Sequence, residues 1–223
     1  FRLQQILMKE IFLRKRNGYQ GEKVLGQGGF GVTYLAYDEE LCQEVVLKKY
    51  RWEHGSLDNE VINKRDYYKK QRKAFLNEAR ILSSLFDIKE VVKVLDYFEE
   101  RENAYIVMEF VQGISLRQYL ESRNQPMSFT EAWNFLLPVM EALEKVHQNK
   151  LIHRDISPDN FIIKEDGSIK LLDFGSAREY AEEKTMTVLV KKGYAPPEQY
   201  SRKGKQGPWT DIYSICATLY EMI

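Results

Sequence analysis

The chain has 223 residues, enough to bury one large core or two smaller ones. Its 33 basic and 33 acidic side chains balance, so no overall charge points to nucleic acid or an anionic membrane surface. The apolar runs are too short to span a bilayer, and the two distant cysteines match no disulfide or metal pattern. We therefore expect a cytoplasmic chain without a membrane segment and without a nucleic-acid partner.

The N-terminal segment, residues 1–16, is predicted to form a basic amphipathic helix, because apolar side chains recur in it at helical spacing. Such a helix could lie on a membrane, but a short helix packed on the following domain is the favoured interpretation. The Asn17-Gly18 pair ends it. We therefore expect a flanking helical segment over residues 1–18.

The next stretch is rich in glycine, and Gly26, Gly28 and Gly31 fit the pattern G-x-G-x-x-G. A dinucleotide site with this pattern needs a helix after the third glycine. The residues that follow Gly31 are β-branched and aromatic instead, which predicts a β-hairpin. Glycines at a hairpin tip let backbone N–H groups approach phosphates closely, and a plain glycine hairpin is the alternative.

A lysine and a glutamate are predicted to meet across two neighbouring elements. Lys48 ends an apolar strand over 45–48, and Glu78 lies in a predicted helix over 72–86. Glu78 is at the edge of the buried helix face, where a carboxylate needs a cation, so Lys48 is its expected partner. An exposed surface pair is the alternative. The expected buried face consists of Phe75, Ala79, Leu82 and Phe86.

The predicted elements change from strands to helices at Gly113. Two more strands are predicted before it, over 91–98 and 105–110. After it, capping boxes of the form Ser-x-x-Gln and Ser-x-x-Glu open two helices. A sheet followed by helices favours two lobes with a cleft between them. The two helices are predicted over 116–121 and 129–147.

Residues 151–160, Leu-Ile-His-Arg-Asp-Ile-Ser-Pro-Asp-Asn, contain the most informative group of polar side chains. Asp155 is a candidate proton acceptor and Asn160 a neutral oxygen ligand on the same tight loop. Asp173 follows thirteen residues after Asn160, at the end of a predicted strand. Oxygen ligands of this kind suit a hard divalent cation. Each piece alone is weak, but their order and spacing together are informative.

Residues 176–192 are polar and too many for a turn, which predicts a functional or disordered loop. The last predicted helix, over 211–223, is apolar on nearly all sides and is therefore expected to be buried all round. A helix of that kind needs covering, so we expect the domain to continue past Ile223.

In this order and at this spacing, the motifs resemble those of protein kinases, most closely the eukaryotic-like Ser/Thr kinases of bacteria. The resemblance runs from about Tyr19 to Ile223. It implies an α+β, bilobal kinase-like fold: a small antiparallel sheet lobe with one helix over 19–111, and a larger, mostly helical lobe over 112–223 that is truncated after the central helix. It implies transfer of the γ-phosphate of ATP to Ser or Thr hydroxyls of a protein or peptide, with Mg²⁺. Flanking regulatory domains would be further partners.

The same resemblance implies roles for individual residues. Asp155 would be the catalytic base, and Asn160 and Asp173 would hold Mg²⁺. Lys48, with Glu78 as its helix partner, would bind the α- and β-phosphates. The positions that match the nucleotide site are Leu25, Gly26, Gln27, Gly28, Gly29, Phe30, Gly31, Thr33, Val46, Lys48, Met108, Glu109, Val111 and Ile162.

The resemblance also implies how the loop over residues 151–160, which would be the catalytic loop, is supported and controlled. His153 and Phe174 would stack, and Asp211 would anchor the loop from below. Arg154 would pair with phosphate on the polar loop. The candidate phosphorylation sites are Thr187 and, in reserve, Thr185.

Four positions depart from the family pattern. Ser157 stands where the family usually has lysine, and Lys191 stands where it has threonine. We therefore expect the ammonium of Lys191 to replace the one lost at Ser157, which adds both to the candidate catalytic residues; a solvated loop lysine is the alternative. Thr33 and Val46 replace the usual valine and alanine of the nucleotide site.

Other functions are considered on the same residues. A pseudokinase scaffold would use this fold only to bind a partner, but the retained set of candidate catalytic residues argues against it. A small-molecule kinase would typically lack Arg154 and the Pro197-Glu198 pair, both present here. A kinase-like domain of a larger peptide-modifying enzyme stays open.

Overall fold

The computed structural model describes residues 12–13, 18–28, 31–50, 64–100, 103–180, 190–201 and 203–223. The chain divides into two compact units. The first is Phe1–Ser83 with Lys93–Phe110, and the second is Ser84–Val92 with Val111–Ile223. The segment 84–92 therefore belongs with the second unit, although it lies within the sequence range 19–111 expected for the first lobe.

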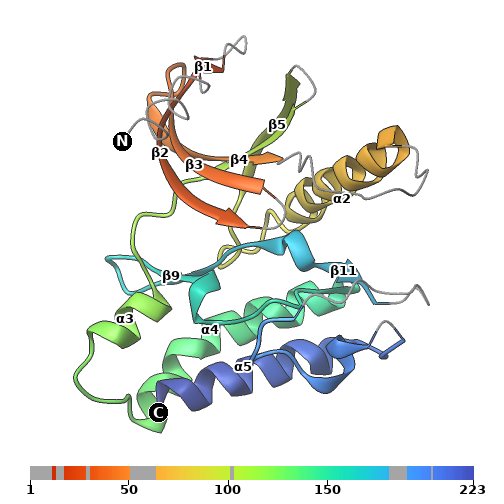
Figure 1. Ribbon diagram of the computed structural model, residues 1–223. Helices are drawn as coiled ribbons and strands as arrows, with labels where there is room; N and C mark the ends of the chain where they lie inside the picture. The colour runs from red at the N-terminus through yellow and green to blue at the C-terminus, as the bar shows by residue number, and fades with distance from the viewer. Residues whose placement is uncertain are drawn as a thin grey trace. The chain divides into compact units, whose positions relative to one another are not determined.

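The first unit contains a six-stranded antiparallel sheet in the order β1-β2-β3-β4-β6-β5 (Figure 1). β2 and β3 form the predicted glycine hairpin, paired from Tyr19 with Asp38 to Gly28 with Gly31. A strand therefore follows Gly31, and the helix that a dinucleotide site requires is not there. The strands are β1 (Phe12–Leu13), β2 (Tyr19–Gly28), β3 (Gly31–Asp38), β4 (Gln43–Tyr50), β5 (Val94–Glu100) and β6 (Asn103–Glu109).

Aromatic side chains form the centre of the core on this sheet. Tyr19 and Phe98 stack with ring centroids 5.7 Å apart, and Phe98 stacks on Tyr105 at 4.9 Å. All three are buried with apolar residues of β3 and β4. These large flat side chains bury much apolar surface, and Phe98 and Tyr105 do so as direct partners across β5 and β6, which favours this register.

The prediction of a helix over residues 1–16 is wrong at Phe12 and Leu13, the two positions of this range that the structure describes. Phe12 and Leu13 form β1, which pairs antiparallel with Gln20 and Tyr19 of β2. Pairing with a sheet edge satisfies the backbone N–H and C=O groups of these residues. The amphipathic pattern of the segment does not indicate that such an edge is available. The rest of the predicted helix lies outside the described residues.

The helix of the first unit, α2, spans Lys64–Ser84 and so begins before the predicted start at Arg72. Three of the four predicted face residues are buried: Phe75, Ala79 and Leu82. The fourth prediction, Phe86, is wrong, because its side chain is 51% exposed. The helix ends at Ser84, so helical spacing no longer applies at residue 86, and Leu85 is buried instead.

The second unit is built mainly from α4 and α5, which pack against each other (Figure 1). Both predicted helix starts are confirmed: Ser115 and Gln118 form a complete capping box, and the Ser128 hydroxyl accepts from the N–H of Glu131. The helices are α3 (Leu116–Ser122), α4 (Phe129–Gln148) and α5 (Pro208–Met222), with 3₁₀ turns η1 (Pro158–Asn160), η2 (Phe174–Ser176) and η3 (Pro197–Tyr200). The strands are β7 (Ile114–Ser115), β8 (Leu151–Ile152), β9 (Phe161–Ile163), β10 (Ile169–Leu171) and β11 (Arg178–Glu179).

Within this chain, α5 is buried on one side, whereas burial all round was expected from the sequence. Its buried side includes Ser214 and Thr218. The Ser214 hydroxyl lies 2.9 Å from the carbonyl of Tyr194 and 3.2 Å from that of Thr210, and the Thr218 hydroxyl donates to the carbonyl of Ser214. Hydrogen bonds of this kind satisfy the hydroxyls inside the core. The aromatic side chains of Trp209, Tyr213 and Tyr220 are exposed instead. None of the helices in the described ranges combines the length and the apolar character that crossing a bilayer requires.

Candidate active site

The loop after β8 is held by one buried carboxylate, that of Asp211 in α5. Its two oxygens accept hydrogen bonds from the backbone N–H groups of His153 and Arg154, both at 2.8 Å. The ring nitrogen Nε2 of His147 lies 2.8 Å from the same carboxylate. Arg154 has a positive φ of 72°, a conformation that costs free energy in a residue other than glycine. The hydrogen bonds to Asp211 therefore fix the loop in this conformation. This agrees with the prediction that Asp211 anchors the loop.

Asp155 and Asn160 are brought together by this loop. The side-chain amide of Asn160 donates to the backbone carbonyl of Asp155 at 2.7 Å and to its carboxylate Oδ2 at 3.2 Å. Burial raises the pKa of Asp155 above its ordinary value; the charge of Asp173 raises it further, while His153 and Lys191 lower it. The carboxylates of Asp155 and Asp173 thus affect each other electrostatically.

Asp173 follows β10 in a left-handed conformation, with φ 54° and ψ 77°. Its carboxylate Oδ1 accepts from the N–H of Gly175 at 3.2 Å. The next side chain, Phe174, is fully buried and contacts His153 edge-to-face, with ring centroids 4.6 Å apart. The predicted contact of these two rings is therefore present, in T-shaped rather than stacked geometry. It ties the Asp173 segment to the catalytic loop.

Asn160 and Asp173 provide oxygen atoms suited to Mg²⁺. The N–H of Leu172 donates to the backbone carbonyl of Asn160 at 2.8 Å, which places the two segments next to each other. Because the amide nitrogen of Asn160 donates to Asp155, its oxygen is a candidate neutral ligand. Mg²⁺ usually takes one or two protein carboxylates together with substrate phosphates, so this donor set fits the ion.

Lys48 of β4 and Glu78 of α2 form a buried ion pair within the first unit. Lys48 Nζ lies 2.7 Å from Glu78 Oε1, and the two residues are only 8% and 2% exposed. The alternative of an exposed surface pair is therefore wrong. An ammonium held in this way is restrained in position by the carboxylate that it contacts.

The residues predicted to line the nucleotide site are distributed over both units. In the first unit, Val46 lies opposite Met108 across the β4–β6 ladder, and Thr33 lies opposite Lys48 across β3–β4. Leu25, Gly26 and Gln27 are exposed on β2, and Glu109 ends β6. Gly29 and Phe30 lie outside the described residues. Val111 and Ile162 belong to the second unit, where Ile162 is in β9.

The structure brings Lys191 and Ser157 together. Lys191 Nζ lies 2.8 Å from the buried hydroxyl of Ser157 and 2.5 Å from the carboxylate Oδ2 of Asp159. The alternative of a fully solvated loop lysine is therefore wrong. Asp159 was not predicted as a functional residue, although its charge in the loop Ser-Pro-Asp-Asn was a visible signal.

Arg154 extends from the catalytic loop into the interior of the second unit and is only 3% exposed. Its Nε donates to the side-chain oxygen of Gln206 at 2.7 Å, and Nη1 donates to the carbonyl of Ser176 at 3.3 Å. Burial lowers the pKa of Arg154, as does the charge of Arg178. Nothing in the sequence marked Gln206 as a partner. The predicted phosphorylation sites, Thr187 and Thr185, lie outside the described residues.

The Pro197-Glu198 pair begins η3, and Glu198 Oε1 accepts a hydrogen bond from the hydroxyl of Thr210 at 2.9 Å. The neighbouring Gln199 is fully buried and donates to the backbone carbonyl of Arg154 at 2.8 Å. The turn η3, which follows the polar loop, is therefore connected both to α5 and to the loop that carries Arg154.

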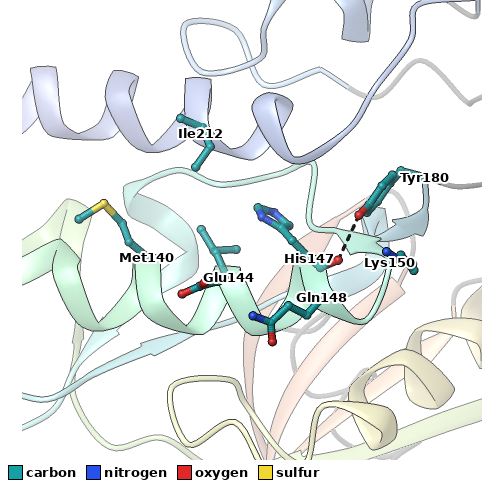
Figure 2. A pocket seen from close by; sticks show the side chains of 8 residues that line it. Met140, Glu144, His147, Gln148, Lys150, Tyr180 and Ile212 are labelled. Atoms are coloured by element: carbon teal, nitrogen blue, oxygen red, sulfur yellow. Dashed lines mark hydrogen bonds between the residues drawn. The ribbon is translucent and has the colours of Figure 1, made fainter.

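A surface hollow of about 440 Å³ lies at the end of α4 (Figure 2). Its wall includes His147 and Tyr180, and the Tyr180 hydroxyl donates to the backbone carbonyl of His147 at 3.2 Å. Ile212 of α5 lines it as well. Asp155, Asn160 and Asp173 are not among its lining residues.

These features define an α+β protein kinase domain, and residues 19–223 match the family model described as "Protein kinase domain". The chain belongs to the protein kinase family. It is similar to the serine/threonine-protein kinase PrkC of Bacillus subtilis (strain 168), with 36% identity over 208 residues. That match covers 92% of this chain and 30% of the relative.

Two further bacterial relatives show a similar coverage. The probable serine/threonine-protein kinase PknB of Lactococcus lactis is 30% identical over 92% of this chain and 31% of its own length. The serine/threonine-protein kinase PknA of Nostoc sp. is 32% identical over 91% of this chain and 36% of its own length. The chain thus spans about a third of the length of these curated relatives.

Proposed function

We propose that this chain is the catalytic domain of a protein kinase that transfers the γ-phosphate of ATP to Ser or Thr hydroxyls of a protein or peptide. The observation that carries the proposal is the arrangement of the catalytic loop. It holds Asp155 and Asn160 in direct hydrogen-bond contact, with the charge of Asp173 acting on Asp155. The named activities of the bacterial relatives support the choice of a Ser/Thr kinase.

In the proposed reaction, Asp155 orients the hydroxyl of the substrate and accepts its proton. The substrate oxygen forms a bond to the γ-phosphorus while the bond from that phosphorus to the bridging oxygen of ADP breaks. Phosphoryl transfer requires little covalent chemistry from the protein, so positioning and neutralisation of charge provide most of the acceleration. The hydrogen bond from Asn160 to Asp155 keeps the carboxylate oriented for this role.

Asn160 and Asp173 would hold Mg²⁺, which would neutralise the phosphate oxygens when bound. The amide oxygen of Asn160 and the carboxylate of Asp173 are ligands of the kind this ion prefers. The contact from Leu172 to Asn160 supports the role, since it keeps the two segments together.

In the first unit, Lys48 would bind the α- and β-phosphates, and Glu78 would keep its ammonium in place. Their 2.7 Å contact in a buried environment supports this assignment. The hairpin of β2 and β3 would supply backbone N–H groups to the phosphates from its glycine-rich tip. Met108, Glu109 and Val111 would provide the edge that binds adenine.

Lys191 and Ser157 are the additional members of the proposed catalytic set. The ammonium of Lys191 would take the role of a phosphate-contacting cation, since residue 157 carries a hydroxyl instead of an amine. Its 2.8 Å hydrogen bond to Ser157, two residues after Asp155, supports this exchange of positions.

The protein in its natural full length, incubated with γ-labelled ATP and Mg²⁺ alone and with a generic protein substrate, tests the proposal. We expect label on Ser or Thr, lost in Asp155→Asn and retained in the matched control Asp166→Asn, whose side chain is an exposed acid in the turn before β10. ATP binding without any transfer would identify a pseudokinase instead. Mass spectrometry of the same sample would show whether Thr187 or Thr185 carries phosphate.

A further inference from the structure

The ammonium of Lys191 contacts a third side chain, Asp159, in addition to Ser157. The Lys191 ammonium donates to the Ser157 hydroxyl at 2.8 Å and to Asp159 Oδ2 at 2.5 Å, so it spans two residues of the catalytic loop. Ser157 is fully buried, whereas Asp159 is partly exposed. A neutral hydroxyl alone is a weak partner for a flexible lysine, and the carboxylate supplies the stronger, charge-assisted bond.

Asp159 is itself fixed by a second cation. Arg117 of α3 lies with its Nε 3.5 Å from Asp159 Oδ1, so the two carboxylate oxygens face two different cations. Burial raises the pKa of Asp159, but the hydrogen bond and charge of Lys191, with those of Arg117, outweigh it and lower the pKa overall. The carboxylate therefore remains charged at neutral pH.

Arg117 has further anchors that prevent it from following Asp159 freely. Its Nη2 donates to the hydroxyl of Tyr194 at 2.6 Å, and its Nη1 pairs with Glu221 of α5. The Tyr194 hydroxyl also bonds to Glu221. The contacts from Lys191 to Asp159 and from Asp159 to Arg117 thus connect the end of the polar loop, the catalytic loop and two helices of the second unit.

The ammonium of Lys191 keeps donor capacity beyond these two contacts. An ammonium has three N–H donors, and two are used by Ser157 and Asp159. Among the described residues, no third acceptor bonds to Lys191. Its charge also acts on Asp155. A cation held near the candidate base, with one donor left over, is suited to a phosphate oxygen.

We propose that Asp159 is a positioning residue for phosphoryl transfer: it holds the ammonium of Lys191 against Ser157, two residues from Asp155. This inference rests on the proposed kinase function and adds to it a residue that does not touch the reacting atoms. Asp159 acts only through Lys191, so its effect on turnover must disappear when Lys191 is removed.

A double-mutant cycle tests this dependence in the full-length protein. We expect Lys191→Ala to lower kcat about 10- to 100-fold, the value of one charge-assisted hydrogen bond, with little change in the KM for ATP. Asp159→Asn should lower kcat about 5- to 10-fold, and Asp159→Glu should recover part of this loss. The double variant should be no slower than Lys191→Ala alone, because coupled residues are not additive.

A second measurement reports the contact without using activity. The rate at which an amine-specific reagent modifies Lys191, followed by mass spectrometry, should rise in Asp159→Asn and stay at the parent value in Asp166→Asn. A merely structural role for Asp159 would lower thermal stability or raise KM without this change in lysine reactivity.

The outcomes of these measurements distinguish the proposed kinase function from the positioning role of Asp159. A parent protein that transfers no phosphate overturns the proposed function and this inference with it. An active parent in which Asp159→Asn turns over normally, leaves Lys191 equally reactive, or adds its full loss to that of Lys191→Ala overturns only the positioning role.

Discussion

His147 Nε2 lies 2.8 Å from a carboxylate oxygen of Asp211, and Asp211 is completely buried. The histidine is near the end of α4 and the aspartate is in the first turn of α5, so their contact joins the two helices. The same carboxylate accepts from the backbone of His153 and Arg154. One side chain therefore fixes both the helix packing and the conformation of the catalytic loop.

Replacing Asp211 by Ala is expected to destabilise the protein by about 3 kcal/mol, because two buried backbone N–H groups lose their acceptor. Urea unfolding followed by circular dichroism measures the change. Glu165→Ala, at an exposed position in the turn before β10, serves as the control and should unfold like the parent. Equal midpoints for both variants would show that the loop is held by other contacts.

Lys48→Met is expected to lower kcat by about 10²- to 10³-fold or more, since it removes a preorganised cation from the phosphates. Glu78→Gln should have a smaller effect, because it keeps the shape and one hydrogen-bond acceptor for Lys48. Steady-state kinetics with thermal unfolding as a control for folding checks both. Normal turnover of a folded Lys48→Met variant would contradict the assignment.

The two glycines at either end of the hairpin pattern should respond differently to alanine. A Cβ atom at Gly31 would overlap the backbone carbonyl of Lys49 on β4, whereas one at Gly26 meets nothing within 4 Å. Gly31→Ala is therefore expected to destabilise the protein by about 1–3 kcal/mol through strain, while Gly26→Ala leaves stability unchanged. Thermal unfolding compares the two. If Gly26→Ala is as unstable as Gly31→Ala, the hairpin packs more tightly than described.

Gln206→Leu is expected to cost about 1.5–3 kcal/mol of unfolding free energy, because it removes an oxygen that accepts a hydrogen bond from a buried cation, Arg154. Gln206→Glu should keep the acceptor and retain more stability. Chemical unfolding of the three proteins measures this order. A Gln206→Leu variant as stable as the parent would show that the other contacts of Arg154 suffice.

The parts that could be predicted from the sequence rest on local signals. Turn glycines identified the β2–β3 hairpin, and capping residues identified the starts of α3 and α4. Lys48 and Glu78 could be paired because each lies on an element with a clear periodicity. The anchor Asp211 was suggested by resemblance, and its contact with His147 was not expected.

The parts that were missed depend on contacts between distant residues. β1 forms because Phe12 and Leu13 find a sheet edge, which no periodicity in their own segment reveals. In α5, the polar Ser214 is buried because its hydroxyl reaches the backbone carbonyl of Tyr194, 20 positions earlier. The contact of Asp159 with Lys191 could not be predicted, because the lysine lies 32 positions later in the sequence. Hydropathy alone cannot indicate such partners.

The boundary of the two units has a consequence for how the protein can be divided. The chain passes from one unit to the other after residues 83, 92 and 110, so neither unit is a continuous piece of sequence. Residues 84–92 supply the carbonyl of Glu90 to the N–H of Leu171 and the N–H of Val92 to its carbonyl. A gene fragment starting at Val111 would leave Leu171 without both partners. Exchange of halves between related kinases should therefore preserve the 84–92 segment of whichever parent supplies the C-terminal half.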